Sequence, residues 1–338
     1  MRAAPALSIL CFVLAAAVGS AHAFGGQAAL PNVNASALFD GKTGGTFGEK
    51  TVNILPRSNR VVIGGFTVTF VTGNEVRIVS HGSALRGTDD AISKTSVTLT
   101  GVSDTTLQAL TDRAYAMFVA QLQAAGREVV PIEQVAPYWA SFRRRASPLT
   151  GSENGITYRT FAPKGIPIFN TSGTDSIGNL RNMAQIEAGF AGAIVIFPDI
   201  WVDFAQMEAS RRSGYRSQQA NTSARLAMSV TQVRGPVARA TSDRVMGMGV
   251  KGDNGFIAMT QPVVSQADFA VMRETAASDN RATRTMSGLL GVGLAARGMS
   301  ANVATTTNQA YAGAAAGVLD EATGRFAKLF AEHPAGGR

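Results

Sequence analysis

Two carboxylates and an indole on one short segment are the side chains of this sequence best suited to acid–base chemistry. Asp199 and Asp203 lie four residues apart, with Trp201 between them. On a strand these three side chains share one face, because alternate residues point to the same side. Paired carboxylates beside an aromatic ring suit the binding or hydrolysis of glycans. The alternative is a solvated pair on the outer face of a sheet.

Histidine, the commonest general base, is scarce. After residue 23 the chain keeps only His81 and His333. His81 precedes a glycine in an expected loop and is the third catalytic candidate, with a solvated loop histidine as the alternative. No H-E-x-x-H, G-x-S-x-G or P-loop string occurs, so zinc protease, α/β-hydrolase and nucleoside triphosphatase readings have no motif support. We predict no metal and no cofactor.

An aromatic and basic stretch is the best candidate for contact with a partner. Together with the segment around Trp201, it gives a predicted binding set of seven residues: Tyr138, Trp139, Phe142, Arg143, Arg144, Arg145 and Trp201. The chain carries a formal net charge of +8, from 31 basic and 23 acidic residues. Such an excess attracts anionic polymers, head groups or acidic proteins over about 8–10 Å at ordinary salt. A solvated basic surface is the alternative.

The first 23 residues have the pattern of a secretory signal peptide. Arg2 precedes an apolar stretch over residues 7–18, and Ala21 and Ala23 fit a signal peptidase site. We therefore predict cleavage after Ala23 and a periplasmic or secreted protein. The only cysteine, Cys11, lies in this segment, so the mature chain would lack disulfides and thiolate chemistry. Export also argues against nucleic acid as a partner. No later segment has 18 uninterrupted apolar residues, so we predict no transmembrane helix in the mature chain.

Periodicity predicts two principal amphipathic helices. The first covers residues 104–125, begins at Ser103 or Asp104 and stops at Gly126. The second covers residues 311–329. A further amphipathic helix is expected after Asp175, and a weaker helical pattern lies near residues 268–275.

Alternation predicts several strands. Residues 66–70 and 76–79 suggest a hairpin around a turn at 72–74, and residues 225–230 and 237–241 suggest another around 234–236. Residues 193–204 read as a long strand that Pro198 would place at a sheet edge.

The expected organisation follows from these elements. It comprises a signal peptide over 1–23, an irregular N-terminal arm over 24–58, a mixed α/β globular domain over 59–331 and a tail over 332–338. A sub-boundary is possible within residues 134–175. The fold class is α/β to α+β, with an antiparallel-rich sheet and the two principal helices packed on one face. The glycine-rich stretch 288–296 predicts a packing or hinge segment, or one that contacts a membrane or partner.

The succession of elements resembles that of exported envelope domains of the curli-secretion-channel and TolB amino-terminal type. The resemblance is carried by an apolar strand ending in Gly-Phe over 61–66, the helix 104–125 and Gly126-Arg127-Glu128-Val129-Val130. The apolar run 193–196, the alternating strand 226–230 with the Gly235 turn and the terminal helix follow. Channel-forming members carry a lipid-modified cysteine after the signal, absent here, and residues 72–102 and 134–175 lie outside the pattern. The resemblance implies an envelope assembly or accessory role without catalysis.

Three functional hypotheses remain open from the sequence. The leading one is a non-enzymatic envelope protein that binds an envelope protein or anionic polymer, or assembles with itself. The second is a glycan or peptide hydrolase that uses the carboxylate pair. The third is an oligomeric pore or fibre subunit.

Overall fold

A computed structural model describes the chain in segments. They are residues 39–43, 51–81, 90–141, 145, 147–168, 185–213, 218–239, 254–279 and 296–336. The chain divides into two compact units, 1–32 and 33–338, and every described residue belongs to the second.

The bounds of the elements are as follows. The strands are β1 (Phe39–Thr43), β2 (Arg60–Ile63), β3 (Thr67–Ser80), β4 (Ala91–Thr100), β5 (Glu128–Val129), β6 (Leu149–Glu153), β7 (Ile156–Phe161), β8 (Ile194–Ile196), β9 (Asp199–Ser213), β10 (Gln218–Arg239), β11 (Asn254–Met259), β12 (Val263–Val264), β13 (Ala270–Asp279) and β14 (Ala296–Thr306). The helices are α1 (Asp104–Ala124), α2 (Ile132–Val135) and α5 (Asn308–Glu332), with 3-10 helices η2 (Thr51–Arg57) and η4 (Ala136–Ser141).

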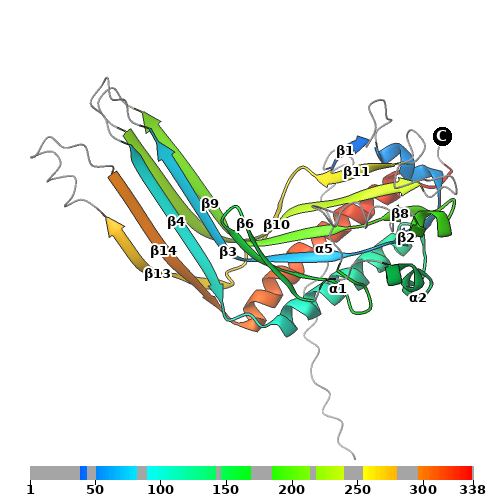
Figure 1. Ribbon diagram of the computed structural model, residues 1–338. Helices are drawn as coiled ribbons and strands as arrows, with labels where there is room; N and C mark the ends of the chain where they lie inside the picture. The colour runs from blue at the N-terminus through cyan, green and yellow to red at the C-terminus, as the bar shows by residue number, and fades with distance from the viewer. Residues whose placement is uncertain are drawn as a thin grey trace, which may run out of the picture. The chain divides into compact units, whose positions relative to one another are not determined.

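The described strands form one mixed, mostly antiparallel sheet. Its main path runs β13-β14-β4-β3-β9-β10-β8-β2-β5, and β1, β6, β7, β11 and β12 pair off this path. Helices α1 and α5 lie side by side against one half of the sheet (Figure 1). The expected α+β class, with an antiparallel-rich sheet and two principal helices on one face, is confirmed.

Both principal helices form where the sequence predicts them. The Ser103 side chain accepts the N–H of Thr106 at the start of α1, and Thr307 accepts that of Ala310 at the start of α5. These caps satisfy amide groups that have no partner within the helix. Buried stripes of the two helices meet in the core, where the rings of Phe118 and Phe326 stack with centroids 5.5 Å apart.

Two strand–helix units stand next to each other. Strand β4 leads into α1 and β14 leads into α5, and the two strands are parallel neighbours in register from Ala91↔Ala296 to Thr100↔Thr305. The helices therefore begin side by side, and the Asn308 side chain accepts hydrogen bonds from the Ser103 N–H and the Thr106 hydroxyl.

The turn predicted at residues 72–74 is wrong. Strand β3 continues through Gly73 to Ser80, and its hairpin partner is β4. Gly73 pairs with Thr98 on β4 and with Thr157 on β7. A Cβ at Gly73 would lie 3.2 Å from Thr157 Cβ, so glycine is used here for a close approach of strands.

The turn predicted at 234–236 is also wrong. Strand β10 passes through Gly235 and Pro236 without a reversal, and it pairs with β9 earlier in the chain and with β11 later. Trp201 is not on an edge strand, because it pairs with Thr69 of β3 and with Gln232 of β10. Pro198 instead falls between β8 and β9.

Other expectations differ in detail. Most of the helical pattern near 268–275 lies instead in strand β13, which begins at Ala270 and pairs with β14. Within the expected N-terminal arm, η2 contributes the fully buried Ile54 and Leu55 to the core, and β1 pairs with β11. Of the helix expected after Asp175, residues 185–189 are described and helical, whereas 169–184 lie outside the described residues. The stretch 288–295 also lies outside them.

Candidate interaction site: the hairpin extension

Half of the sheet reaches beyond the two principal helices. We call this part the hairpin extension: β3 from Gly73, β4, β9 from Asp203, β10 up to Met228, β13 and β14. It contains three hairpins, β3–β4, β9–β10 and β13–β14. Their turn ends lie together, because Ala91 pairs with both Ser80 and Ala296, and Ser93 contacts Thr222 of β10 (Figure 1).

The hairpin extension has two layers. Strands β13, β14, β4 and β3 form one layer, and the β9–β10 hairpin packs against the face of β4. Hydroxyl groups meet between them. Thr222 Oγ1 lies 2.8 Å from Ser93 Oγ and 2.7 Å from Thr95 Oγ1, and Thr95 Oγ1 lies 2.9 Å from Ser300 Oγ. We call these four residues the hydroxyl seam.

The outer edge of the hairpin extension is strand β13. Within the described residues β13 pairs along one edge only, with β14. A register shift between Glu274 and Ala276 bulges the strand, and Arg273 and Glu274 are exposed. Charges and bulges of this kind limit unspecific pairing at an open edge. Among the described strands, none occupies the other edge of β13.

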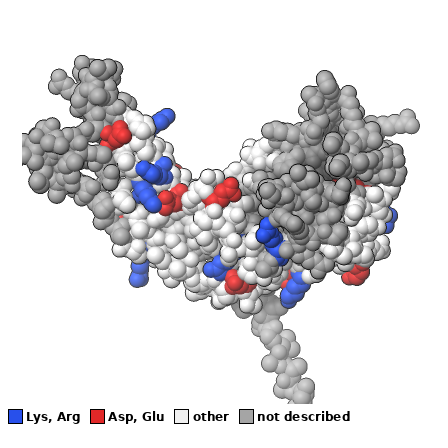
Figure 2. Space-filling view, in the orientation of Figure 1, with Lys and Arg blue, Asp and Glu red and all other residues white. Residues whose placement is uncertain are grey.

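Exposed apolar side chains accompany this edge. Val271 on β13 is 62% exposed and Met299 on the neighbouring β14 is 49% exposed, the two largest values among exposed large hydrophobic residues of the described chain. Lys94 on β4 is the register neighbour of Met299, and its Nζ lies 2.8 Å from Glu75 Oε2. In the view of Figure 2, basic and acidic side chains are interspersed rather than gathered in one basic patch.

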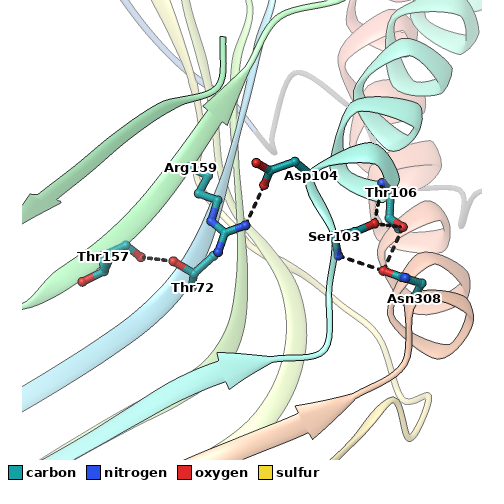
Figure 3. A network of polar contacts seen from close by, with 7 residues as sticks. All are labelled: Thr72, Ser103, Asp104, Thr106, Thr157, Arg159 and Asn308. Atoms are coloured by element: carbon teal, nitrogen blue, oxygen red, sulfur yellow. Dashed lines mark hydrogen bonds and ion pairs between the residues drawn. The ribbon is translucent and has the colours of Figure 1, made fainter. Parts of the chain in front are cut away.

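Polar contacts join β7 to α1 and the first turns of α1 and α5 to each other, next to the hairpin extension (Figure 3). Arg159 of β7 donates to Asp104 at the start of α1, with Nη1 and Oδ1 2.6 Å apart. Next to it, Asn308 joins the first turns of both helices, and the Thr72 hydroxyl donates to the Thr157 carbonyl oxygen at 3.3 Å. The carboxylate of Asp104 also lies at the positive end of the α1 dipole. Side chains of this chain therefore already form hydrogen bonds at the N-terminal ends of α1 and α5.

The three catalytic candidates lie in separate surroundings. Asp199 Oδ1 accepts the Thr67 hydroxyl and its Oδ2 accepts the Trp201 Nε1–H, at 2.9 and 3.0 Å. Asp203 accepts the backbone N–H groups of Phe204 and Ala205.

His81 contacts a different part of the chain from Asp199 and Asp203. Its Nδ1 lies 3.4 Å from Asp90 Oδ2 at the turn end of the β3–β4 hairpin, and its side chain is largely exposed.

The predicted aromatic and basic stretch divides between core and surface. Trp139 is 2% exposed and its Nε1–H donates to the Gly64 carbonyl oxygen at 2.8 Å, so this indole supports the core. The Tyr138 ring packs against Phe190 with centroids 5.3 Å apart. Arg145 is exposed, whereas Phe142, Arg143 and Arg144 lie outside the described residues.

Trp201 belongs to an aromatic contact across the sheet. Its ring lies 5.3 Å from that of Tyr158 on β7, and Tyr158 covers Gly151 on the neighbouring β6, where a Cβ would lie 2.5 Å from the phenol. Aromatic rings often cover a cross-strand glycine in this way. Trp201 is therefore only partly accessible. Its indole N–H already donates a hydrogen bond to Asp199.

No group of three or more His, Cys, Asp or Glu side chains suited to a metal ion occurs among the described residues. In the same part of the chain, no helix combines the length and apolar character needed to cross a membrane. Comparisons of the chain with models of protein families, with curated proteins and with solved structures found no match.

Sequence reasoning missed the hairpin extension. Its signal was present as long alternating runs in 67–80, 91–100 and 218–230, but Gly73 and Asn74 in the first run favoured a turn.

Proposed function

We propose that this protein is a non-enzymatic component of the cell envelope that binds an envelope partner or assembles with further copies of itself through the hairpin extension. The observation that carries the proposal is the edge strand β13, with exposed Val271 near its start and exposed Met299 near the other end of the ladder on the neighbouring β14. Large exposed apolar side chains next to free strand edges mark surfaces that pair with other chains.

The surroundings of the catalytic candidates support a role without turnover. Asp199 and Asp203 each serve as acceptors for groups of the fold, and His81 has an exposed carboxylate neighbour. A glycosidase requires two carboxyl groups placed across one scissile bond. The signal-like segment 1–23 supports export to the envelope, and the layout resemblance to curli-channel and TolB amino-terminal domains supports an assembly or accessory role.

The test replaces the exposed apolar pair by Val271→Asp together with Met299→Asp. Both side chains are exposed, so the fold should persist and circular dichroism should stay unchanged. We expect the wild-type chain to form concentration-dependent oligomers in sedimentation velocity, or to sediment with isolated cell envelopes, and the double variant to lose that behaviour.

Val264→Asp is the matched control, because Val264 is also an exposed hydrophobic residue, 36% accessible, on β12 outside the hairpin extension. It should behave as the wild type. Equal oligomerisation and equal envelope binding in wild type and double variant would contradict the proposal.

A second comparison concerns the basic stretch. Replacement of Arg143, Arg144 and Arg145 by Ala should weaken envelope binding at low salt and leave it unchanged at high salt, if the stretch contacts an anionic polymer. Unchanged binding at low salt would remove it from the proposed surface.

A further inference from the structure

The four-stranded layer of the hairpin extension has one face turned away from the β9–β10 hairpin. Ser93 and Thr95 of β4 are buried, and both contact Thr222 of β10. Alternate residues of a strand point to opposite sides, so Lys94 and Thr98 point away from the hairpin. We call the side of the layer that carries Lys94 and Thr98 the β4 outer face.

The register of the strands extends this face across the layer. Residues directly opposite each other on neighbouring strands have their side chains on the same face. Lys94 is the register partner of Arg77 on β3 and of Met299 on β14. Arg77 is exposed and Met299 is 49% exposed, so both side chains are accessible from this side.

The same reasoning places the edge strand β13 on this face. Thr98 pairs with Val303 of β14, and Val303 pairs with Arg273 of β13. Val271 lies two residues before Arg273 and therefore points to the same side. The exposed or partly exposed residues that carry the argument are Arg77, Lys94, Thr98, Val271, Arg273 and Met299.

The outward face of the β9–β10 hairpin is different in character. It consists of the residues that alternate with Thr222 and with its register partner Ala209. The described residues of that face are all polar: Gln206, Glu208, Ser210, Asn221, Ser223 and Arg225. The hairpin extension thus has one polar outward face and one that combines basic with large apolar side chains.

Basic side chains outnumber acidic ones on the β4 outer face. Arg77 and Lys94 stand directly opposite each other, and like charges in that position destabilise a sheet. Glu75 forms an ion pair with Lys94 at 2.8 Å and so balances one of the two. Arg273 adds a third cation, whereas Glu274 belongs to the other side of β13 by alternation. An anionic partner would offset this excess of positive charge.

The apolar side chains of the β4 outer face are separated from one another. Val271 pairs with Thr305 and Met299 pairs with Lys94, so each has a polar register partner. Along β14 the two positions, 299 and 305, are about 20 Å apart at about 3.3 Å per residue. Protein interfaces depend on a central cluster of buried apolar side chains. Single apolar side chains between Lys and Arg are instead suited to the headgroup region of a membrane.

We propose that the β4 outer face binds a lipid surface that carries anionic headgroups. Arg77, Lys94 and Arg273 attract the headgroup phosphates, and Val271 and Met299 enter the boundary between headgroups and acyl chains. This inference rests on the proposed function, because it names the chemistry of the envelope partner that the hairpin extension contacts.

The first experiment asks which face meets the lipid. An environment-sensitive fluorophore is attached to Thr98→Cys on the β4 outer face or to Ser223→Cys on the opposite outward face, both exposed. Cys11, the only native cysteine, is replaced by Ser in both chains. With vesicles of equal parts phosphatidylglycerol and phosphatidylcholine, we expect the fluorescence to rise for Thr98→Cys and to stay unchanged for Ser223→Cys. Vesicles of phosphatidylcholine alone should have no effect on either. An equal response at both labels, or none at either, would overturn the proposal.

The second experiment tests the basic side chains by co-sedimentation with the anionic vesicles. Arg77→Ser together with Arg273→Ser should weaken binding about 25-fold, at about fivefold for each cation lost near an anionic surface. Lys164→Ser together with Arg225→Ser is the matched control. It removes the same charge from Lys164, which is 84% exposed outside the hairpin extension, and from Arg225 on the opposite outward face. The control should bind as the wild type. Equal weakening by the two pairs would mean that binding follows net charge and not this face.

The variant Val271→Asp together with Met299→Asp separates this inference from the proposed function. Loss of binding to anionic vesicles in the double variant alone would support both. If the double variant loses binding to isolated cell envelopes while the wild type ignores protein-free vesicles, the partner is an envelope protein. The lipid inference then fails and the proposed function stands. A wild-type chain that binds neither envelopes nor vesicles and forms no oligomers would contradict both. All replaced side chains are exposed, so circular dichroism should match that of the wild type.

Discussion

At the scale of single residues, Gly101 shows how a junction depends on one missing side chain. It connects β4 to α1 with a positive φ of 92°, and a Cβ there would lie 2.0 Å from the Thr306 carbonyl oxygen. We predict that Gly101→Ala lowers the free energy of unfolding by more than the about 1–3 kcal/mol expected from backbone strain alone. Urea unfolding measures the difference.

Gly126→Ala is the control for that prediction. Gly126 also has a positive φ, 78°, but no atom lies within 4 Å of a Cβ added there. Its variant therefore reports the conformational strain without the clash. Equal destabilisation of the two variants would contradict the prediction. It would mean that the backbone shifts to remove the clash between the new Cβ at position 101 and the Thr306 carbonyl oxygen without loss of stability.

Residue types alone did not predict the surroundings of every candidate side chain. Trp139 stands among basic residues, so the sequence suggested a contact surface, yet its indole reaches the Gly64 carbonyl oxygen, 75 positions earlier. A partner that far away in sequence leaves no local pattern. Asp203 was found as a residue suited to chemistry, but its contact with Asn74 depends on the same kind of long-range placement.

At the scale of elements, the paired helices α1 and α5 should owe their stability to aromatic packing rather than to ion pairs. Phe118 is fully buried against Phe326, whereas Arg113 and Asp320 form an ion pair at 2.6 Å with partly exposed side chains. We predict that Phe118→Ala lowers the free energy of unfolding by about 3–5 kcal/mol. Arg113→Ala should lower it by about 0–1 kcal/mol.

Urea unfolding followed by far-ultraviolet circular dichroism compares the two variants at equal helix content. A loss for Arg113→Ala as large as that for Phe118→Ala would mean that the polar contact, and not the aromatic one, holds the helices together.

The elements also show which features a sequence makes visible. Helices α1 and α5 were predicted within a few residues because their apolar stripes and caps are local signals. The strand continuity of β3 and β10 was missed, because Gly73 and Gly235 favour turns locally while neighbouring strands hold them extended. The point at which β3 passes from pairing with β9 to pairing with β4 follows from those pairings, so it was not predictable either.

At the scale of the whole described unit, the two halves of the sheet are held together by different forces. Where the helices cover the sheet, large apolar side chains such as Phe66, Phe70 and Phe330 are fully buried. Between the layers of the hairpin extension, the hydroxyl seam joins small polar side chains instead. Since burial of apolar area supplies most of the stability of a fold, the extension should open more easily than the helix-covered half.

This difference predicts that removing a hydroxyl group from the hydroxyl seam lowers the stability of the hairpin extension and not that of the helix-covered half. Thr95→Val keeps the shape of a buried side chain but removes a hydroxyl that contacts Thr222 and Ser300. We expect amide exchange in β4 and in the first half of β10 to become about tenfold faster, as for a loss of about 1.4 kcal/mol. The urea midpoint of the helices should hardly change, because they unfold in a later, separate step.

Thr98→Val, three residues along the same strand and exposed, makes the same chemical change outside the seam and should alter neither measurement. If Thr95→Val instead shifted the urea midpoint and the exchange of helical amides together, the sheet would be one cooperative unit. The hairpin extension could then not open without unfolding the core, because both halves would share a single transition. A partner can therefore change the hairpin extension alone only if the response to Thr95→Val is local.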